Sequence, residues 1–348
     1  MSMPESTPKV YIVLLNWNSW GHTLECLESI LRSDHRNYQV IVVDNGSTDQ
    51  SVESIIAWTQ AKISVWTTPD NSLRQYSHPP FAKVVPCLHY NLEQAAKGGD
   101  PKMETEAYAQ LPQGLTHPLI EIETGRNLGF GRGNNVALEY ICAKGDGDYI
   151  WLLNNDTVIE PTTLSRMLAA ARLQPGIIGS IVKHYAPSEQ VQAYGGGHIS
   201  FFSGRNRLET SQVVRLDYIT GASLMLDAAT LHCLGGFDEN IFMYFEDCEY
   251  CLCARKHGIS LTTSDAVVFH KGGISSPDGY FPWKNVYQSK IYTMLKHYGV
   301  GPWVLGVIVA WAINLVNPRV SADKKRASRE ALHSLCRSIF KAWREAKC

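Results

Sequence analysis

Residues 149–157 read YIWLLNNDT, and this stretch decides the kind of fold that the chain can adopt. Its first five residues, 149–153, form an apolar run, typical of a strand buried on both faces of a mostly parallel sheet. The run ends in Asn154, Asn155 and Asp156. Ligands of open α/β sheets bind beyond the carboxyl ends of the strands, and a carboxylate there suits a divalent cation that holds a phosphate. The alternative is an Asx turn that only caps a helix.

The same order of strand, polar turn and helix occurs twice near the start of the chain. Apolar runs at 10–15 and 40–43 predict two buried strands, which end in the polar segments 16–18 and 44–49. Apolar residues at helical spacing follow each polar segment. This pattern predicts right-handed βαβ units, an α/β fold and functional groups gathered at one sheet edge. A weak third strand is expected at 63–66.

The segment 67–118 interrupts the pattern. It holds seven prolines and the sequence Lys97-Gly98-Gly99-Asp100, and it shows no clear apolar face. A segment of this length is expected either to be disordered or to act as a lid over a site.

A glycine-rich loop follows a strand expected at 119–124. Residues 125–135 read GRNLGFGRGNN and lead into an apolar helix. Glycines allow close approach of the backbone to a ligand, and free N–H groups at a helix start favour phosphate. The alternative is a tight turn with asparagine caps.

Two features of the C-terminal half carry candidate chemistry. In residues 242–250, FMYFEDCEY, three carboxylates follow an aromatic run and open a helix, so they are candidate catalytic groups or simple helix caps. Further strands are expected at 177–182, 213–218 and 267–269. His270 follows the last of these, where a lone histidine is more often structural than a ligand.

The tail from residue 280 has a different composition. Aromatic residues alternate with lysines, and then residues 300–316 are almost wholly apolar. This run is shorter than the ~20 residues that a spanning helix needs. Basic residues flank it on both sides, which favours a helix lying at an anionic membrane face. A buried helix of a soluble domain is the alternative.

The overall composition excludes some classes of function. The 348 residues carry a formal net charge of −1, which argues against nucleic acid as a partner. Nine cysteines occur without zinc-site spacing, as expected for thiols in a reducing compartment. The N-terminal segment is polar and does not resemble a secretory signal. A cytoplasmic protein, peripheral at the inner face of the membrane, is therefore expected.

Taken together, these motifs resemble the family 2 (GT2) glycosyltransferases of GT-A fold, and within them rhamnosyltransferase-like members. The resemblance spans about residues 9–275 and rests on LLNWN, VVDNGSTD, NLGFGRGNN, WLLNNDT, GGFDE, FMYFEDCEYCLCARKHG and VVFHKGG. It implies a glycosyltransferase domain at 1–278, with 67–118 as an insertion. Residues 279–348 would then form a helical extension, with 300–316 as the segment that contacts membrane.

The resemblance also implies roles for single residues. Asp247 matches the catalytic base, with Glu246 beside it. Asp156 and His270 match metal ligands for Mg²⁺ or Mn²⁺, although Asn154 stands where the strict DxD motif has its first aspartate. The implied nucleotide-sugar-binding residues are Asn16, Asn18, Asp44, Arg126, Asn127, Gly133, Asn134, Asn154 and Asn155.

The implied activity is inverting transfer of a sugar, with rhamnose as one candidate, in cell-surface polysaccharide synthesis. The expected partners are a dTDP- or UDP-sugar donor, a glycan or lipid-linked glycan acceptor, a membrane surface and a second copy of the chain in a homodimer. One alternative is a non-catalytic nucleotide-sugar-binding or scaffold protein. A nucleotidyltransferase is disfavoured because it would carry a basic glycine-rich loop where this chain has Asn16-Trp17-Asn18.

Overall fold

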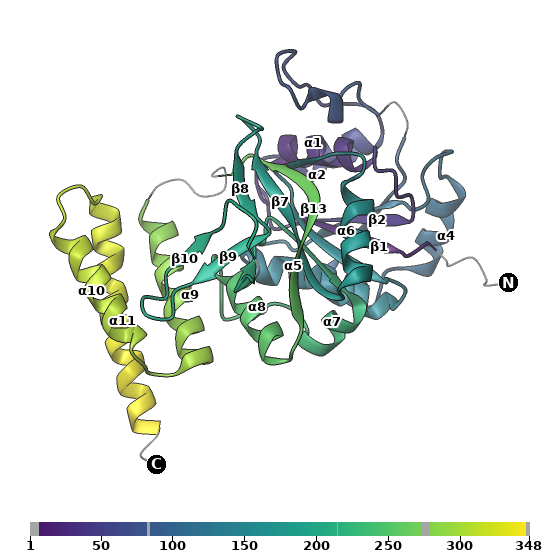
Figure 1. Cartoon of the computed structure of the whole chain (residues 1–348). Coiled ribbons are helices and arrows are strands. Elements are labelled where there is room, and N and C mark those ends of the chain that lie inside the picture. The colour runs from purple at the N-terminus through teal and green to yellow at the C-terminus, as the bar shows by residue number, and fades with distance from the viewer. Residues whose placement is uncertain (1–6, 82–83, 214, 273–278, 346–348) are drawn as a thin grey trace.

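The computed structural model describes residues 7–81, 84–213, 215–272 and 279–345. A ten-stranded sheet forms the centre of the molecule, with strand order β3-β4-β2-β1-β5-β12-β7-β13-β6 and β8 paired to β7 (Figure 1). Its strands are β1 (Val10–Asn16), β2 (Tyr38–Asp44), β3 (Cys87–Asn91), β4 (Leu119–Glu123), β5 (Tyr149–Asn154), β6 (Thr157–Ile159), β7 (Gly176–His184), β8 (Val191–Tyr194), β12 (Ser223–Asp227) and β13 (Ser260–His270). A smaller sheet contains β9 (Gly196–Ile199), β10 (Asn206–Leu208) and β11 (Tyr218–Ile219).

The direction of the strands determines which residues meet. Strands β3, β4, β2, β1 and β5 are parallel, so their carboxyl ends lie at one edge of the sheet. Strand β12 runs antiparallel between β5 and β7, which brings its first residue, Ser223, opposite Leu153 at the same edge. Strand β13 is parallel to β7 and ends there with His270. The predicted α/β fold with a mostly parallel sheet is confirmed.

Helices cover both faces of the sheet, and the apolar residues of each strand alternate between two cores. One core lies beneath α5, α7 and α8, and the other lies beneath α1, α2 and α6. The helices of this part are α1 (Trp20–Ile30), α2 (Ser51–Thr59), α3 (Leu92–Ala96), α4 (Pro101–Ala109), α5 (Phe130–Lys144), α6 (Thr163–Leu173), α7 (Ala228–Leu234) and α8 (Glu246–Lys256), with the short 3-10 helix η1 (Arg74–Tyr76).

Three predictions about this part of the chain were wrong. Residues 63–66 are not a strand. The segment 67–118 is not a structureless insertion: its described residues contain β3, α3 and α4, and β3 forms the sheet edge beside β4. An edge strand with one half-exposed face, CLHYN, lacks the long apolar run that marks an inner strand. The strand expected at 213–218 is only Tyr218–Ile219, and residue 214 lies outside the described residues.

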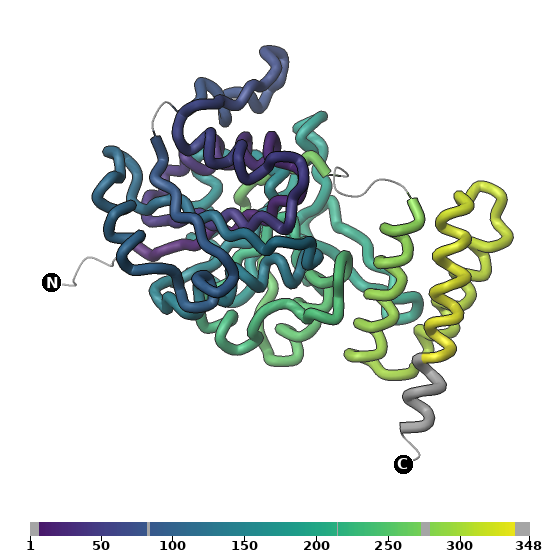
Figure 2. Tube along the Cα trace, turned by 180° about the vertical axis from the view of Figure 1, so that it is seen from behind, coloured from purple at the N-terminus to yellow at the C-terminus, as the bar shows by residue number. Residues whose placement is uncertain are grey.

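The C-terminal helices α9 (Tyr280–Tyr298), α10 (Trp303–Val316) and α11 (Ala322–Glu345) pack around a core of their own. In Figures 1 and 2 they stand beside the sheet, with α9 nearest to it. The contact with α8 is polar: buried His297 Nε2 lies 2.9 Å, and partly exposed Lys296 Nζ lies 2.8 Å, from buried Glu249 Oε1. Lys296 Nζ also lies 2.5 Å from Asp238 Oδ2. The extension is therefore tied directly to α8.

Two expectations concern this extension. The boundary expected at 278/279 falls at residues 273–278, which lie outside the described residues. Among the helices that the structure describes, none is long and apolar enough to cross a membrane.

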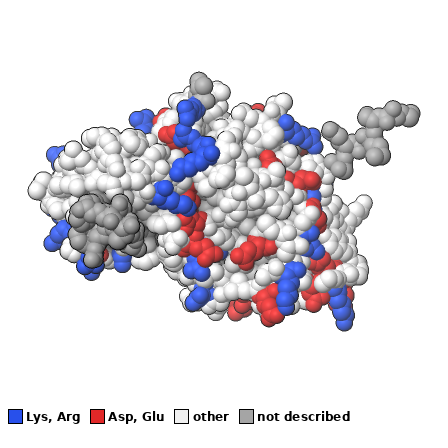
Figure 3. Space-filling view, turned by 90° about the horizontal axis from the view of Figure 1, so that it is seen from below, with Lys and Arg blue, Asp and Glu red and all other residues white. Residues whose placement is uncertain are grey.

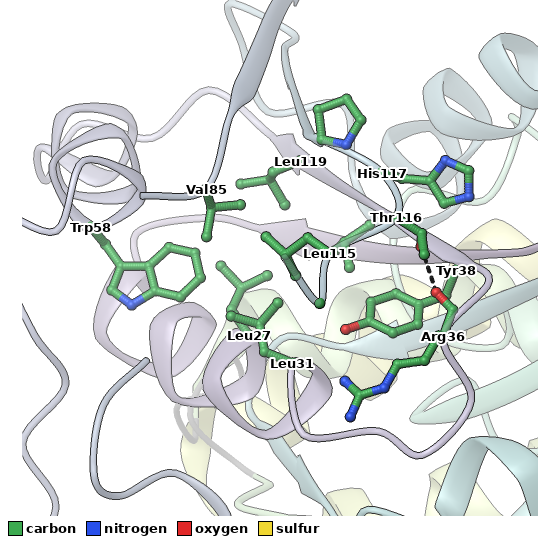
Figure 4. Close-up of a pocket in the computed structure, with 13 residues that line it drawn as sticks. Leu27, Leu31, Arg36, Tyr38, Trp58, Val85, Leu115, Thr116, His117 and Leu119 are labelled. Atoms are coloured by element: carbon green, nitrogen blue, oxygen red, sulfur yellow. Dashed lines mark hydrogen bonds between the residues drawn. The ribbon is translucent and has the colours of Figure 1, made fainter. Parts of the chain in front are cut away.

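A small crevice lies at the opposite, amino-terminal edge of the sheet (Figure 4). Its lining is largely apolar, with Leu27, Trp58 and Leu115 facing one another, and its volume is about 20 Å³. That space suits about one water molecule. The crevice is a packing gap and does not fit a sugar nucleotide.

Candidate active site

A pocket of about 250 Å³ lies at the carboxyl edge of the sheet. It is enclosed by the ends of β1 and β5, the segment before β12, the start of α5 and the start of α8. Its lining residues are Leu15, Trp17, Asn45, Asn127, Gly129, Phe130, Asn154, Asn155, Asp156, Thr220, Gly221, Ala222, Met243, Tyr244, Glu246, Asp247 and His270. The pocket thus brings Asp156, Asp247 and His270 together from three separate parts of the chain.

Asp156 and His270 form one wall of this pocket. Asp156 Oδ1 lies 3.2 Å from His270 Nε2, which also lies 3.2 Å from Asn154 Nδ2. On the other side of the ring, His270 Nδ1 donates a hydrogen bond of 2.7 Å to Gln192 Oε1 on β8. This bond places a proton on Nδ1. In the neutral ring, the lone pair of Nε2 would then face the negative carboxylate of Asp156, which is unfavourable unless a proton or a cation lies between them.

The ionisation state of Asp156 is consistent with a cation at this position. Burial alone would raise its pKa, but the hydrogen bond and charge of His270 outweigh burial and hold the pKa below the ordinary 3.8. Asp156 is therefore an anion at neutral pH. An imidazole nitrogen and a carboxylate oxygen at this separation could bind one divalent cation, with the open pocket supplying further positions.

Asn16 and Asp44 lie beneath the pocket and do not line it. Asn16 is fully buried: its Nδ2 donates to Asp44 Oδ1 at 2.8 Å, and its Oδ1 accepts from Thr23 Oγ1 at 2.8 Å and Asn155 Nδ2 at 3.4 Å. Asp44 Oδ2 accepts from Ser47 N at 2.9 Å. These bonds join the ends of β1, β2 and β5, so the two residues hold the floor of the site in place.

Other predicted binding residues lie at the rim or behind the wall. Asn18 is exposed and accepts a hydrogen bond from Thr48 N, and Arg126 is exposed beside the glycine-rich loop. Asn134 is buried and donates to Phe130 O at 2.9 Å. A Cβ atom on Gly133 would lie 2.6 Å from Leu15 Cδ1, so this glycine permits the close packing of α5 on β1.

The glycine-rich loop also touches the opposite wall. Gly129 has φ +85°, and a Cβ atom there would lie 2.1 Å from Phe242 O. Phe130 N donates to the same carbonyl at 2.9 Å. Asn127 Oδ1 accepts from Gly129 N at 2.8 Å, which fixes the loop. The loop and the segment before α8 are therefore joined by a hydrogen bond and a close backbone contact.

Glu246 and Asp247 start α8 on that opposite wall. The two residues before them, Tyr244 and Phe245, both have positive φ, an uncommon conformation for large side chains and one often found at functional sites. Asp247 Oδ2 accepts from Gly221 N at 3.0 Å, and Oδ1 accepts from Cys248 N at 2.7 Å. Glu246 Oε2 is buried and has no hydrogen-bond partner among the described residues.

Burial raises the pKa of both Glu246 and Asp247, and the charge of Asp247 adds to the rise at Glu246. Carboxylates with raised proton affinity are suited to accept a proton from a substrate.

Several pocket residues were not predicted as site residues from the sequence motifs. Trp17 and Asn45 line the pocket, and both stand next to asparagine or aspartate residues that the motifs did highlight. Lys271 lies close by, with Nζ 2.5 Å from Glu25 Oε2 and 2.7 Å from His22 Nδ1. The position of Lys271 beside His270 was a signal, but its partners on α1 come from the fold.

Comparison with known families agrees with the fold and the pocket. Residues 11–74 match the model for "Glycosyl transferase family 2", and residues 109–280 match that for "Glycosyltransferase like family 2". The chain is a family 2 glycosyltransferase. All of the pocket-lining residues of this glycosyltransferase lie inside those two matched regions.

Two curated proteins are similar to this glycosyltransferase. The low-salt glycan biosynthesis hexosyltransferase Agl10 of Haloferax volcanii is 22% identical over 169 residues, which cover 46% of this chain and 54% of that protein. The rhamnosyltransferase WbbL of Escherichia coli is 24% identical over 159 residues, 41% of this chain and 60% of that protein. The chain thus matches somewhat more than half of the length of either relative.

Solved structures show the same fold. The mannosyltransferase PcManGT of Pyrobaculum calidifontis, in complex with GDP-Man and Mn²⁺, aligns with a TM-score of 0.51 and 14% identity over 96% of this chain and 76% of that one. GalNAc-T7, with UDP, GalNAc and Mn²⁺, aligns with a TM-score of 0.54 and 12% identity over 94% of this chain and 55% of that one. The predicted GT-A fold is confirmed.

Proposed function

We propose that this chain catalyses inverting transfer of a sugar from a nucleotide-diphosphate donor to a hydroxyl group of a glycan or lipid-linked glycan. One observation carries the proposal: Asp156, His270 and Asp247, which come from separate elements, line the same pocket. A metal-binding group and a general base in one pocket are what this reaction requires. The similarity to a hexosyltransferase and a rhamnosyltransferase favours a hexose or deoxyhexose, with a dTDP- or UDP-linked rhamnose as the first donor to test.

Asp156 and His270 would hold the divalent cation, Mn²⁺ or Mg²⁺. Bound there, the cation would neutralise charge on the departing diphosphate. The imidazole nitrogen in this pair favours Mn²⁺ over Mg²⁺. Two of the structurally similar transferases contain Mn²⁺, which supports the same choice.

Asp247 would act as the base. As the acceptor oxygen attacks the anomeric carbon, Asp247 takes the hydroxyl proton, the new C–O bond forms, and the bond to the diphosphate oxygen breaks. A single in-line displacement inverts the anomeric centre. The hydrogen bonds from Gly221 N and Cys248 N orient the carboxylate for this step.

The competing hypothesis is a non-catalytic nucleotide-sugar-binding protein of the same fold. Such a protein would need the metal-binding wall but would have no use for a buried carboxylate with raised pKa on the other wall. A thermal-shift screen of UDP-, dTDP- and GDP-sugars with Mn²⁺ should find one donor class that raises Tm. Slow release of nucleoside diphosphate from that donor, accelerated by a glycan acceptor, would support transfer, whereas stabilisation without any release would support the binding protein.

We further propose that α10 places the protein at a membrane surface. Leu305, Val309, Ile313 and Val316 are exposed by 61%, 49%, 54% and 80%, on one helix. Figure 3 shows the lobe of the extension as a largely uncharged surface with Lys and Arg at its margins. Exposed apolar residues bordered by basic ones suit an anionic lipid surface.

Replacing Leu305, Val309 and Ile313 by Gln should abolish sedimentation with anionic vesicles while leaving Tm nearly unchanged, because these side chains lie outside the helical core. Leu173→Gln is the matched control, since Leu173 is exposed by 88% on the sheet domain. Equal sedimentation of the triple variant and the control would contradict a role of α10 in attachment.

A further inference from the structure

A second group of metal-type ligands lies on the edge strands, away from the pocket. His89 on β3 and Glu121 and Glu123 on β4 each offer one ligand atom, and these three atoms lie within 4.8 Å of one another. His89 pairs with Glu121 in the strand register, and the three side chains share the α2 face of the sheet. None of them lines the candidate active site.

Glu121 is the unusual member of this group. Its side chain is fully buried, and its Oε1 and Oε2 atoms have no hydrogen-bond partner within the described parts of the chain. The nearest polar atom is His89 Nδ1, in direct contact with Oε2. A buried carboxylate without hydrogen bonds is unfavourable unless a cation or a proton compensates it.

The other two side chains leave the group open to solvent. The side chains of His89 and Glu123 are 46% and 43% exposed, and His89 Nε2 lies 3.3 Å from Glu123 Oε1. The ring therefore lies between two carboxylates. An ion can reach the group from solvent, and water can complete its coordination. Asp44, the neighbour of Glu123 in the register of β2, is occupied by Asn16 and Ser47 and does not add a ligand.

We infer that His89, Glu121 and Glu123 form a second divalent-cation site, which links the edge strand β3 to β4. One imidazole and two carboxylates form a donor set for a first-row ion such as Mn²⁺ or Zn²⁺. The ion supplies the second partner that the buried Glu121 carboxylate, contacted by His89 alone, otherwise lacks among the described residues. It also ties down a strand whose flanking segments are rich in proline. This site does not depend on sugar transfer, so it can be tested independently of the proposed activity.

The test uses the full chain with Asp156→Asn and His270→Gln, which removes the pair of ligands in the pocket. Equilibrium dialysis against Mn²⁺ alone should then find one ion per chain, and Mn²⁺ should raise Tm. Adding Glu121→Gln should weaken Mn²⁺ binding at least about tenfold and remove the rise in Tm. The amide has the size of the carboxylate, so the strand should still fold.

Two further variants make the result decisive. His89→Gln changes an exposed side chain and should weaken binding to a similar extent without harming the fold. Glu93→Gln, at an exposed acid of α3 paired with Lys97, should leave binding unchanged. The inference is overturned if the parent double variant binds no Mn²⁺ at millimolar concentration, which would mean that a proton compensates Glu121, whose pKa burial raises. It is equally overturned if Glu121→Gln and His89→Gln bind as tightly as that parent.

Discussion

The two walls of the pocket shift the pKa values of their carboxyl groups in opposite directions. On the wall formed by β5 and β13, Asp156 is held ionised by His270, and its pKa is lowered. On the wall formed by α8, burial raises the pKa of Asp247 and Glu246. The first environment suits a permanent charge that holds a cation, and the second suits a group that gains a proton during turnover. The difference indicates that the wall with Asp156 binds the donor and that the wall with Asp247 activates the acceptor.

The largest expected effect comes from Asp247→Asn. The amide keeps the size of the side chain but cannot take a proton, so kcat should fall by ~10²–10⁴. Donor affinity, measured by titration with Mn²⁺ present, should stay nearly constant. Asp156→Asn is the contrasting variant and should weaken metal and donor binding as well. Equal loss of donor binding in both variants would erase the distinction between the walls.

The next effect concerns Gln192, which accepts a hydrogen bond from His270 Nδ1. Gln192→Leu removes the acceptor that sets the proton on Nδ1, so the ring is free to turn or change tautomer. The apparent affinity for Mn²⁺ should fall by about 10- to 100-fold. Activity at saturating Mn²⁺ should largely recover. An unchanged Mn²⁺ dependence would show that His270 is oriented by something else.

The pH dependence of turnover tests the second wall. Asp247 must be ionised to accept a proton, and its raised pKa means that protonation persists above the ordinary 3.8. The rate should therefore rise with pH along an acidic limb displaced upward from that value. Measured kcat from about pH 3.5 to pH 9 would locate the limb, and a limb centred at or below 3.8 would contradict the raised pKa.

The smallest effect is expected for Glu246→Gln. This change removes a neighbouring carboxyl group but leaves the proposed base in place, so kcat at its plateau should fall by less than about tenfold. The stability of the Glu246→Gln variant should also depend on pH. The raised pKa of Glu246 means that this carboxyl group stabilises the fold fully below its ordinary pKa of 4.5. That contribution is lost as pH rises through the raised pKa. Tm of the variant relative to the parent should therefore increase with pH. A dead Glu246→Gln enzyme would assign the base to Glu246.

The sequence predicted the inner part of the sheet better than its edge. Strands such as β1, β2 and β5 are buried on both faces, and continuous apolar runs identify them. The edge strand β3 escaped notice because half of its residues are polar and prolines surround it. The short insertion of β12 between β5 and β7 is likewise a matter of long-range pairing.

The same distinction between local patterns and long-range pairing applies to the residues of the candidate site. Asp156, Asp247 and His270 stand in local patterns that sequence can reveal, and the fold brings them to one pocket. Asn16 and Asp44 were expected at the ligand, but their hydrogen bonds to each other depend on the spacing of two strands. The role of Gln192 beside His270 comes from a strand pairing that no local motif encodes.

The contacts of Glu249 on α8 with Lys296 and His297 on α9 matter for any attempt to shorten the protein. Sequence composition suggests a cut near residue 278, which would yield a minimal enzyme. That cut would remove His297 and Lys296, and it would leave the buried carboxylate of Glu249, two residues from Asp247, without these partners. A buried carboxylate that loses its partners destabilises the fold. A shortened enzyme should therefore keep α9, together with the residues of α10 and α11 that cover its apolar face.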